Sequence, residues 1–434
     1  MKSRKKEEIV CFDRLYSEVI VPILNSVKDK REENKSYLLL DVLKAGFAIF
    51  SLKAPSLLSF KKMSKAEDSN IKSIYGIKEI PGDNGLRQIL DNLCPEELRK
   101  GFNNLFNYIK DLKILDNFRY WNNYLTVSVD GVEFFKSKEV NCEKCMQRKH
   151  RDGKTSYYHS MLSAVIVHSE KKEVLVLDNE PIVKQDGAQK NDCERNAANR
   201  LISNLKSLYS NELMVFTFDA LYACRPIVEQ LNQVENWRYV IRIKEDGNKH
   251  LFQQFDKKNK DHKVNWHTIK NNEGSHEFGY INNAELNASS THLGVNMLYY
   301  VWTNKKGEVK IFTWITNIKL NKSSVFQVMK IGRSRWKIEN ETFNTLKNQG
   351  YNFTHNYGHG GNNLCTIFAY LMMLAFYVDQ IQQHSCSHFK KLLLGLKTKV
   401  KLWDAMRAVF KILPRKNMTE LFFSIADMYQ IRLI

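Results

Sequence analysis

YLTVSVDG, at residues 124–131, alternates apolar and polar side chains and ends in Asp130 and a glycine. A period of two in a stretch rich in β-branched residues predicts a β-strand. A second stretch, ELMVFTFDALY at residues 212–222, has the pattern of a buried strand that ends at Asp219. A single aspartate after a strand is most often a turn residue or a helix cap. The pair therefore becomes informative only with a third acid.

Between these two strands lie two further β-rich stretches and one helical stretch. HSMLSAVIVH (159–168) and KEVLVLDNE (172–180) surround a charged turn, which predicts a meander. CERNAANRLISNLKSLY (193–209) has apolar residues at helical spacing. Three strands, a helix and a further strand are the order of an RNase H-like core, in which carboxylates at strand ends meet over the middle of the sheet. We therefore expect an α/β (α+β) fold.

The character of the sequence changes along the chain and divides it into five regions. We expect a helical DNA-binding N-terminal region at 1–118, although an ordinary helical subdomain is an equal alternative. The first part of the RNase H-like core is expected at 119–236, a β-rich insertion at 237–315, and the second part of the core at 316–385. A basic helical C-terminal region is expected at 386–434.

The composition favours a polyanionic partner. Of 434 residues 43% are hydrophobic, so most of the chain should fold, and the formal net charge is +19. Each phosphate that Lys or Arg neutralises releases counterions, which makes nucleic acid the best match for such a surplus. The alternatives are a merely soluble basic protein or one that contacts acidic lipid. We expect double-stranded DNA as the partner.

Features of export and of membrane insertion are weak. The longest apolar run, residues 367–378, is too short to span a bilayer and predicts a buried helix. The basic opening MKSRKKEEIV is followed by no adequate apolar core, so we expect no secretory signal. Eight cysteines in so long a chain do not make a disulfide framework. We expect a reducing, cytoplasmic, nucleoid-associated location in a prokaryote, and no membrane.

The third acid is Glu339, in RSRWKIENETFNTLK at residues 333–347. Arg335 lies one helical turn earlier on the same face, where its guanidinium is able to grip a phosphate in bidentate fashion. The alternative is a surface Arg–Glu pair. Phosphodiester cleavage goes best with two divalent cations held by carboxylate oxygens. We therefore predict that Asp130, Asp219 and Glu339 hold two Mg²⁺ ions, with Mn²⁺ as a substitute.

The order strand–Asp, strand–Asp, β-insertion and a helix with R-W-x-I-E resembles the DDE transposases of bacterial insertion sequences. The likeness is greatest to the cut-and-paste group with a tyrosine–arginine–glutamate–lysine signature. It covers residues 75–385 and is most specific in RWKIEN. The resemblance implies an RNase H-like catalytic fold, with Asp130, Asp219 and Glu339 as the metal-binding catalytic triad and Arg335 as the signature arginine.

Two positions depart from that signature. Gly332 stands where the tyrosine is expected, and Leu346 stands where the lysine is expected, with Lys347 one residue later. Glu341 is the alternative third acid if the helix is irregular. In a regular helix it would point about 200° away from Glu339. The missing tyrosine affects a phosphate contact and not the metal site.

A second group of side chains has the types that bind zinc. Cys142 and Cys145 form a CxxC pair, which is half of a zinc site. Cys193 with His159 or His150 would complete it with structural Zn²⁺. The alternative is a loop that contains two reduced thiols.

Further candidate DNA contacts lie around the third acid and in the insertion. The phosphate contacts expected beside Arg335, which position DNA without reading its sequence, are Arg333, Lys347 and Arg242. In enzymes of the resembled group, insertion aromatics can hold a flipped base, and stacking is worth about 1 to 3 kcal/mol per base. Here the candidates are Trp266 and Trp302, with Tyr299 and Tyr300 nearby, although strand aromatics are more often core residues.

The Gly-rich stretch THNYGHGGNN, residues 354–363, follows the predicted catalytic helix. It contains His355 and His359, and it could line a DNA channel. The composition favours a loop that only reverses the chain.

Together these features predict a DNA transposase. The N-terminal helices would recognise terminal inverted repeats, and a homodimer would pair two ends. Each site would free a 3′-hydroxyl, which then attacks target DNA. The alternatives are an RNase H-like nuclease or resolvase that cuts without joining, and a non-catalytic DNA-binding protein derived from a transposase.

Overall fold

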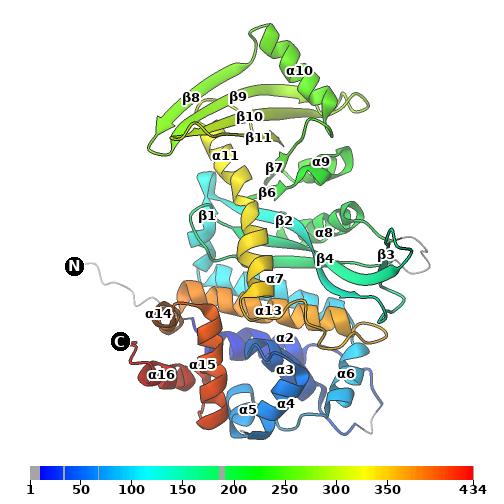
Figure 1. The fold of residues 1–434 in the computed structure, drawn as a ribbon, viewed down its shortest axis with the longest axis vertical. Helices are drawn as coiled ribbons and strands as arrows, with labels where there is room; N and C mark the ends of the chain where they lie inside the picture. Colours follow the sequence, from blue (N-terminus) through cyan, green and yellow to red (C-terminus); the bar gives the residue numbers. More distant parts are fainter. Residues whose placement is uncertain (1–9, 33–34, 67, 185–190, 434) are drawn as a thin grey trace.

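The computed structural model describes residues 10–32, 35–66, 68–184 and 191–433. Most of the basic opening segment, on which the expectation of no secretory signal rests, lies outside the described residues. The described chain forms a long body in which one sheet occupies the upper and middle parts and helices occupy the lower part (Figure 1).

Five strands at the centre of the sheet follow the RNase H-like order β5-β4-β2-β6-β7. β4 runs antiparallel to both β2 and β5, whereas β2, β6 and β7 are parallel to one another. Parallel neighbours need crossover connections, and α8 and α9 supply them. The bounds are β2 Tyr124–Ser137, β4 Thr155–Val167, β5 Leu175–Ile182, α8 Glu194–Tyr209, β6 Met214–Phe218, α9 Arg225–Asn232 and β7 Trp237–Arg242. The expected fold class is confirmed.

The stretch expected as a β-rich insertion continues this sheet. Its first strand, β7, already belongs to the core, and β11 pairs antiparallel with both β7 and β10. Hydrogen bonding therefore runs unbroken from the core to β8, and the sheet has eleven strands within the described residues. α10 packs on β9 at this end. The bounds are β1 Arg119–Tyr120, β3 Met146–Lys149, α10 Lys249–Lys260, β8 Asn265–Asn271, β9 Gly274–Glu285, β10 Gly294–Asn304 and β11 Val309–Thr316.

The N-terminal and C-terminal helices pack together as one helical body. α4 contacts α15 and α1 contacts α16, although they stand at opposite ends of the chain. The Asn70 side chain donates to the backbone carbonyls of Phe410 and Leu413, at 2.7 and 2.8 Å. The bounds are α1 Phe12–Leu15, η1 Tyr16–Ile20, α2 Val21–Asn25, α3 Leu39–Ser51, α4 Leu57–Ala66, α5 Asp68–Tyr75, α6 Asp83–Asp91, α7 Pro95–Asp111, α14 Ser387–Leu396, α15 Lys399–Ile412 and α16 Met418–Met428.

One disulfide fastens this helical body. Cys11, just before α1, is bonded to Cys386, just before α14. The other six cysteines are free thiols. One bridge is not a disulfide framework, as the sequence predicted.

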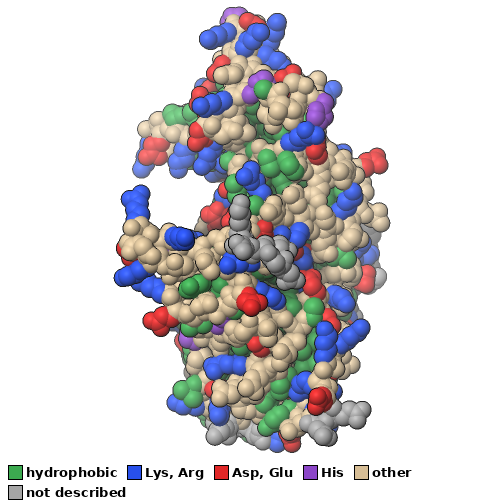
Figure 2. Space-filling model, turned by 90° about the vertical axis from the view of Figure 1, so that its right-hand side faces the viewer, with side chains coloured by type: hydrophobic (Ala, Val, Ile, Leu, Met, Phe, Trp, Pro, Cys, Tyr) green, Lys and Arg blue, Asp and Glu red, His purple; other side chains and the backbone are tan. Residues whose placement is uncertain are grey.

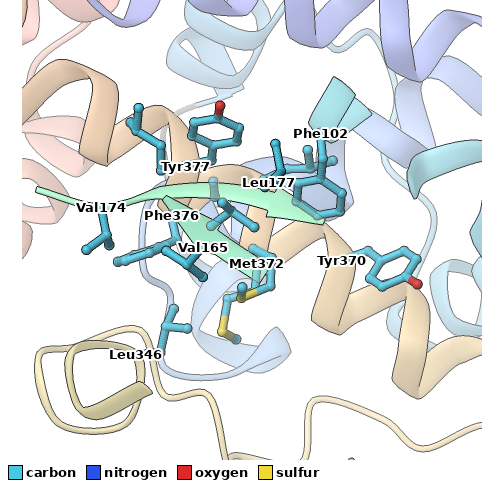
Figure 3. Close-up of a cluster of buried hydrophobic side chains, with 14 of the residues drawn as sticks. Phe102, Val165, Val174, Leu177, Leu346, Tyr370, Met372, Phe376 and Tyr377 are labelled. Carbon is cyan, nitrogen blue, oxygen red and sulfur yellow. The ribbon is translucent and has the colours of Figure 1, made fainter. Parts of the chain in front are cut away.

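α13 (Leu364–Ser385) lies between the sheet and the helical body, as Figure 1 shows. It contacts α3, α7 and β5, and its side chains meet those of β4, β5 and α12 in the apolar cluster of Figure 3. The helix is long and apolar enough to cross a membrane, but 94% of its most apolar window is buried inside the protein. The expected buried helix is therefore present, and it is longer than the apolar run suggests.

Candidate active site

Asp130 and Asp219 occupy equivalent register positions on the neighbouring parallel strands β2 and β6. The predicted strand end at Asp130 is wrong, because β2 continues to Ser137 through its pairing with β4, whereas β6 ends just before Asp219 as expected. Ser128 of β2 lies opposite Thr217 of β6, so each aspartate stands two residues beyond the last paired position. Asp219 follows β6 directly and caps the short helix η4 (Ala220–Tyr222) by accepting the backbone N–H of Leu221 at 2.9 Å. The strand pairing therefore brings the two predicted acids to the same edge of the core.

A helix brings Glu339 to that edge. α11 (Val325–Ser334) packs on β6 and β7, and a π-helical turn, η5 (Ile338–Phe343), follows it and contacts β2. π-Turns within helices are rare and are frequent at functional sites. The Ser128 hydroxyl donates to the Arg335 carbonyl at 3.1 Å, which ties the junction of the two helical segments to β2.

Arg335 joins the first and third acids. Its Nη1 donates to Asp130 Oδ2 at 2.9 Å, and its Nη2 donates to Glu339 Oε1 at 2.7 Å. The two carboxylates are 209 positions apart in the sequence numbering, 130 against 339, and the single guanidinium contacts both. The expected i,i+4 relation between Arg335 and Glu339 is present despite the π-turn.

The site carries an excess of negative charge. Burial raises the pKa of Asp130 to about 7, although the Arg335 guanidinium opposes the rise. The negative charges of Glu339 and Asp219 raise this pKa further. Although burial lowers the pKa of Arg335, hydrogen bonding to Glu339 and the charge of Asp130 raise it overall. Both shifts have the direction that a cluster of acids produces.

Positive charge gathers beside the acids. A pocket of about 390 Å³ opens next to Asp219, and its lining includes Arg335 with three further basic side chains, Arg242, Lys244 and Arg333. Burial lowers the pKa of Arg242, and the positive charge of Arg335 lowers it further, so the two guanidinium groups influence each other. A pocket with this lining suits an anion such as a phosphate.

Glu341, Leu346 and Lys347, the other candidate signature residues, do not line the pocket beside the acids. Glu341 is partly buried, and its charge acts on Lys337 and Lys399 instead of on the other acids. Leu346, where the signature lysine is expected, is fully buried in the core, and Lys347 is exposed. The structure therefore brings Glu339, and not Glu341, to Arg335.

Gly332 is required by the packing of the catalytic helix. A Cβ atom built on it would lie 2.6 Å from both Cε2 and Nε1 of Trp314, which is only 2% exposed. Trp314 belongs to β11 and stacks on Phe312. The indole thus fills the space that a tyrosine at position 332 would need.

The candidate stacking residues lie on opposite faces of the sheet. Trp266 on β8 and Tyr299 on β10 both lie opposite Gly279 of β9, so they are on the same face of the sheet. Both rings contact Phe255 of α10. Trp302 lies on the other face beside Tyr300, which is fully buried.

Of the two candidate tryptophans, Trp302 lies beside a basic residue of the site. The guanidinium of Arg333 lies 5.8 Å from the centre of its ring, and Lys310 lies 5.6 Å from the same centre. Within the described residues, the guanidinium of Arg333 lies over the rings of Trp302 and Phe312 and not over the ring of Trp266.

One neighbouring acid is not visible in the sequence pattern. Glu194, in the first turn of α8, lies against Gly131, where a Cβ atom would come within 2.6 Å of its carboxylate. The Tyr222 hydroxyl donates to Glu194 at 3.1 Å. An acid at a helix N-terminus is usually explained by the helix dipole, so no sequence pattern selects Glu194 as a site residue.

The predicted zinc ligands are only partly brought together. Cys142, Cys145 and His159 converge, but Cys193 is exposed at the start of α8 and His150 bonds Ser156 instead. The fourth member of the cluster is His359, from the Gly-rich loop that was expected only to reverse the chain. Its glycine neighbours gave no signal of a ligand.

Comparison with known proteins identifies the family of the chain. No curated protein matches the chain. The family of transposase DDE domains matches residues 131–376, which is more than half of the chain and begins one residue after Asp130. Members of such a family act on DNA, and the match runs from within β2, through the sheet extension and α11, into α13. The chain therefore belongs to the transposase DDE domain family.

Proposed function

We propose that this protein is a DNA transposase that cleaves transposon ends and joins the freed 3′-hydroxyls to target DNA. The observation that carries the proposal is the Arg335 guanidinium, which contacts Asp130 and Glu339 at once. An ordinary surface ion pair would have no reason to involve an acid on a core strand from a distant part of the chain.

The acids have the ligand chemistry that a pair of divalent cations needs. Carboxylate oxygens are the ligands that Mg²⁺ requires, and Asp130, Asp219 and Glu339 supply them at one edge of the core. Burial raises the pKa of Asp130, and the charges of Glu339 and Asp219 raise it further, so a bound cation would stabilise the ionised carboxylates. When bound, two Mg²⁺ or Mn²⁺ ions would supply an activated hydroxyl and stabilise the leaving oxygen.

The basic side chains have the complementary task of holding DNA. Arg335, Arg242 and Lys244 line the pocket beside Asp219 and would bind the phosphates that flank the scissile bond. Figure 2 shows a notch on the left edge of the side view, below the end formed by β8–β11, with Lys and Arg side chains on both sides of it. A hollow flanked by positive charge suits a duplex backbone.

The chemistry has two balanced steps. Water attacks the phosphorus at the transposon end, the bond from phosphorus to O3′ breaks, and a 3′-hydroxyl and a 5′-phosphate result. The 3′-oxygen then attacks a target phosphorus, forms a new P–O bond and displaces the target 3′-hydroxyl. No covalent bond to the protein is needed. A homodimer would hold the two transposon ends, so that both are joined to the target DNA in one complex.

A cleavage assay with matched variants tests the proposal. The substrate is duplex DNA from the two flanks of the gene, which should carry inverted repeats, incubated with Mg²⁺ or Mn²⁺. We expect nicking by the wild type and by Glu341→Gln, and none by Glu339→Gln or Asp130→Asn. Glu339 and Glu341 both lie in η5, so a substitution that only disturbs the folding of this turn should affect both variants. Loss of nicking in Glu339→Gln alone would therefore point to the carboxylate of Glu339.

Three results would contradict the proposal in different ways. Absence of nicking with either cation would refute the enzymatic function, and full cleavage by Asp130→Ala would refute the assigned site. Released ends without joined products in a strand-transfer assay would identify a nuclease or resolvase instead of a transposase.

A further inference from the structure

We infer that Cys142, Cys145, His159 and His359 form a closed structural zinc site that fastens the β2–β3 loop and β4 to the loop before α13. The four ligand atoms come from three separate places in the fold. The CxxC pair lies in the loop between β2 and β3, His159 lies on β4, and His359 lies in the loop before α13. All four ligand atoms lie within 4.8 Å of one another.

The separations match tetrahedral zinc. Bond lengths of about 2.3 Å to sulfur and about 2.0 Å to nitrogen imply distances of about 3.8 Å for S···S, about 3.5 Å for S···N and about 3.3 Å for N···N. The two sulfurs are 3.8 Å apart, and His159 Nε2 lies 3.5 and 3.3 Å from them. His359 Nε2 lies 3.2 Å from Cys145 Sγ and 3.2 Å from His159 Nε2. Each distance agrees with its expected value within a few tenths of an ångström.

Hydrogen bonds alone do not account for this convergence. The Nδ1 of His359 lies 2.8 Å from the Gly360 carbonyl, which can only accept, so Nδ1 carries the proton and Nε2 offers a lone pair. That lone pair faces the Nε2 of His159 and a sulfur. Two thiols and two imidazoles aimed at one point are satisfied together by a cation, and this ligand set selects zinc over hard cations such as Mg²⁺.

The protein holds each ligand by independent contacts. The backbone N–H of Cys145 donates to the Cys142 carbonyl at 3.1 Å, and this hydrogen bond closes a tight turn. His159 lies opposite Phe135 in the register of β2 and β4, which fixes its position on the sheet. Asp91 accepts the backbone N–H groups of residues 361–364 at 2.8 to 3.2 Å, and so fixes the loop that carries His359.

The site is separate from the acids. His159 lies four residues along β4 from Ser163, the register partner of Asp130, which is about 13 Å at about 3.3 Å per residue. Cys145, His159 and His359 are all buried, so no position is left open for a substrate, as in structural zinc sites. The consequence is a cross-link between β2–β4 and α13, formed by residues 214 positions apart.

Metal analysis of the full-length protein tests the inference. We expect about one zinc per chain by elemental mass spectrometry, and loss of that zinc in His359→Ala and Cys145→Ser. Cys193→Ser and His355→Ala are the matched controls and should keep it, because neither residue belongs to the cluster. Asp219→Asn should also keep it, which separates this metal from cations at the acids.

A spectroscopic measurement avoids dependence on variants that fold poorly. Wild-type protein loaded with Co²⁺ should show intense visible bands of tetrahedral cobalt and a sulfur-to-cobalt charge-transfer band. His359→Cys should retain the metal and strengthen the charge-transfer band. Octahedral Co²⁺ bands, zinc-free folded protein, zinc retained by His359→Ala, or a disulfide between Cys142 and Cys145 would each overturn the inference. None of these readouts uses DNA cleavage, so the inference and the proposed transposase activity succeed or fail separately.

Discussion

Replacing Gly332 by alanine should destabilise the protein, although alanine is the better helix former. The new Cβ would lie 2.6 Å from two ring atoms of Trp314 and 3.1 Å from a third. Ordinary carbon contacts are about 3.5 to 4.0 Å, so the indole would have to retreat by about 1 Å. The ring is 2% exposed, and its stack on Phe312, with centroids 5.7 Å apart, blocks that movement.

The magnitude follows from two opposing effects. Overpacking a buried site costs up to about 3 kcal/mol, and two ring atoms inside 3.0 Å place this change at the upper end. Replacing a helical glycine by alanine stabilises the helix by about 1 kcal/mol. The net expected loss is about 2 kcal/mol in the free energy of unfolding, measured as the shift of the urea midpoint.

A double-mutant cycle with Trp314→Leu isolates the contact. In that background the alanine should no longer meet the indole, so Gly332→Ala should become stabilising by about 1 kcal/mol through helix propensity alone. The expected coupling between the two positions is therefore about 3 kcal/mol. Equal effects of Gly332→Ala in both backgrounds, or a single variant as stable as the wild type, would refute the packing argument.

Removing the Arg335 guanidinium should affect cation binding and catalysis in opposite directions. Arg335→Ala should bind Mn²⁺ more tightly in calorimetry without DNA, because the carboxylates of Asp130 and Glu339 lose their ion pair with Arg335. The same variant should cleave DNA at least about tenfold more slowly. Weaker Mn²⁺ binding would contradict this expectation. Lys53→Met should lower stability by about 3 to 5 kcal/mol, because Asp379 stays buried without its ionic partner, and adding Asp379→Leu should recover part of the loss in urea unfolding. Burial raises the pKa of Glu212, but two basic partners hold it below its ordinary value. The stability from Glu212 is therefore present above about pH 4.3 and is lost as the pH falls through the lowered pKa. Glu212→Gln should therefore weaken the pH dependence of the urea midpoint below about pH 4.3, and an unchanged pH dependence would contradict this.

The local patterns in the sequence predicted the core well. Alternation around Val127 and Val215 gave two strands, and the parallel register then made Asp130 and Asp219 neighbours. The spacing of Arg335 and Glu339 also carried over, because an i,i+4 contact is local. What these features share is that a few adjacent residues determine them.

Non-local pairing could not be predicted in the same way. The antiparallel pairing of β11 with β7 turns the expected insertion into a continuation of the core sheet, and no single stretch encodes that pairing. The fourth member of the Cys/His cluster was missed for the same reason. Cys193 was nearer in sequence to the CxxC pair, but His359 is the residue that the fold brings to it.

The departure at Gly332 shows how the sheet extension and the acids depend on one another. Trp314 belongs to β11, pairs with Arg242 across the sheet, and packs on the helix three residues before Arg335. Ser128 holds the other side of the same helix through the Arg335 carbonyl. The helix therefore rests between the extension and β2, and both supports fix the direction of the guanidinium. A tyrosine at position 332 would have to displace Trp314, lift the helix and draw Arg335 away from Asp130. The packing of α11 against Trp314 thus accounts for the absence of the signature tyrosine, and Arg335 keeps its contacts to Asp130 and Glu339 without it.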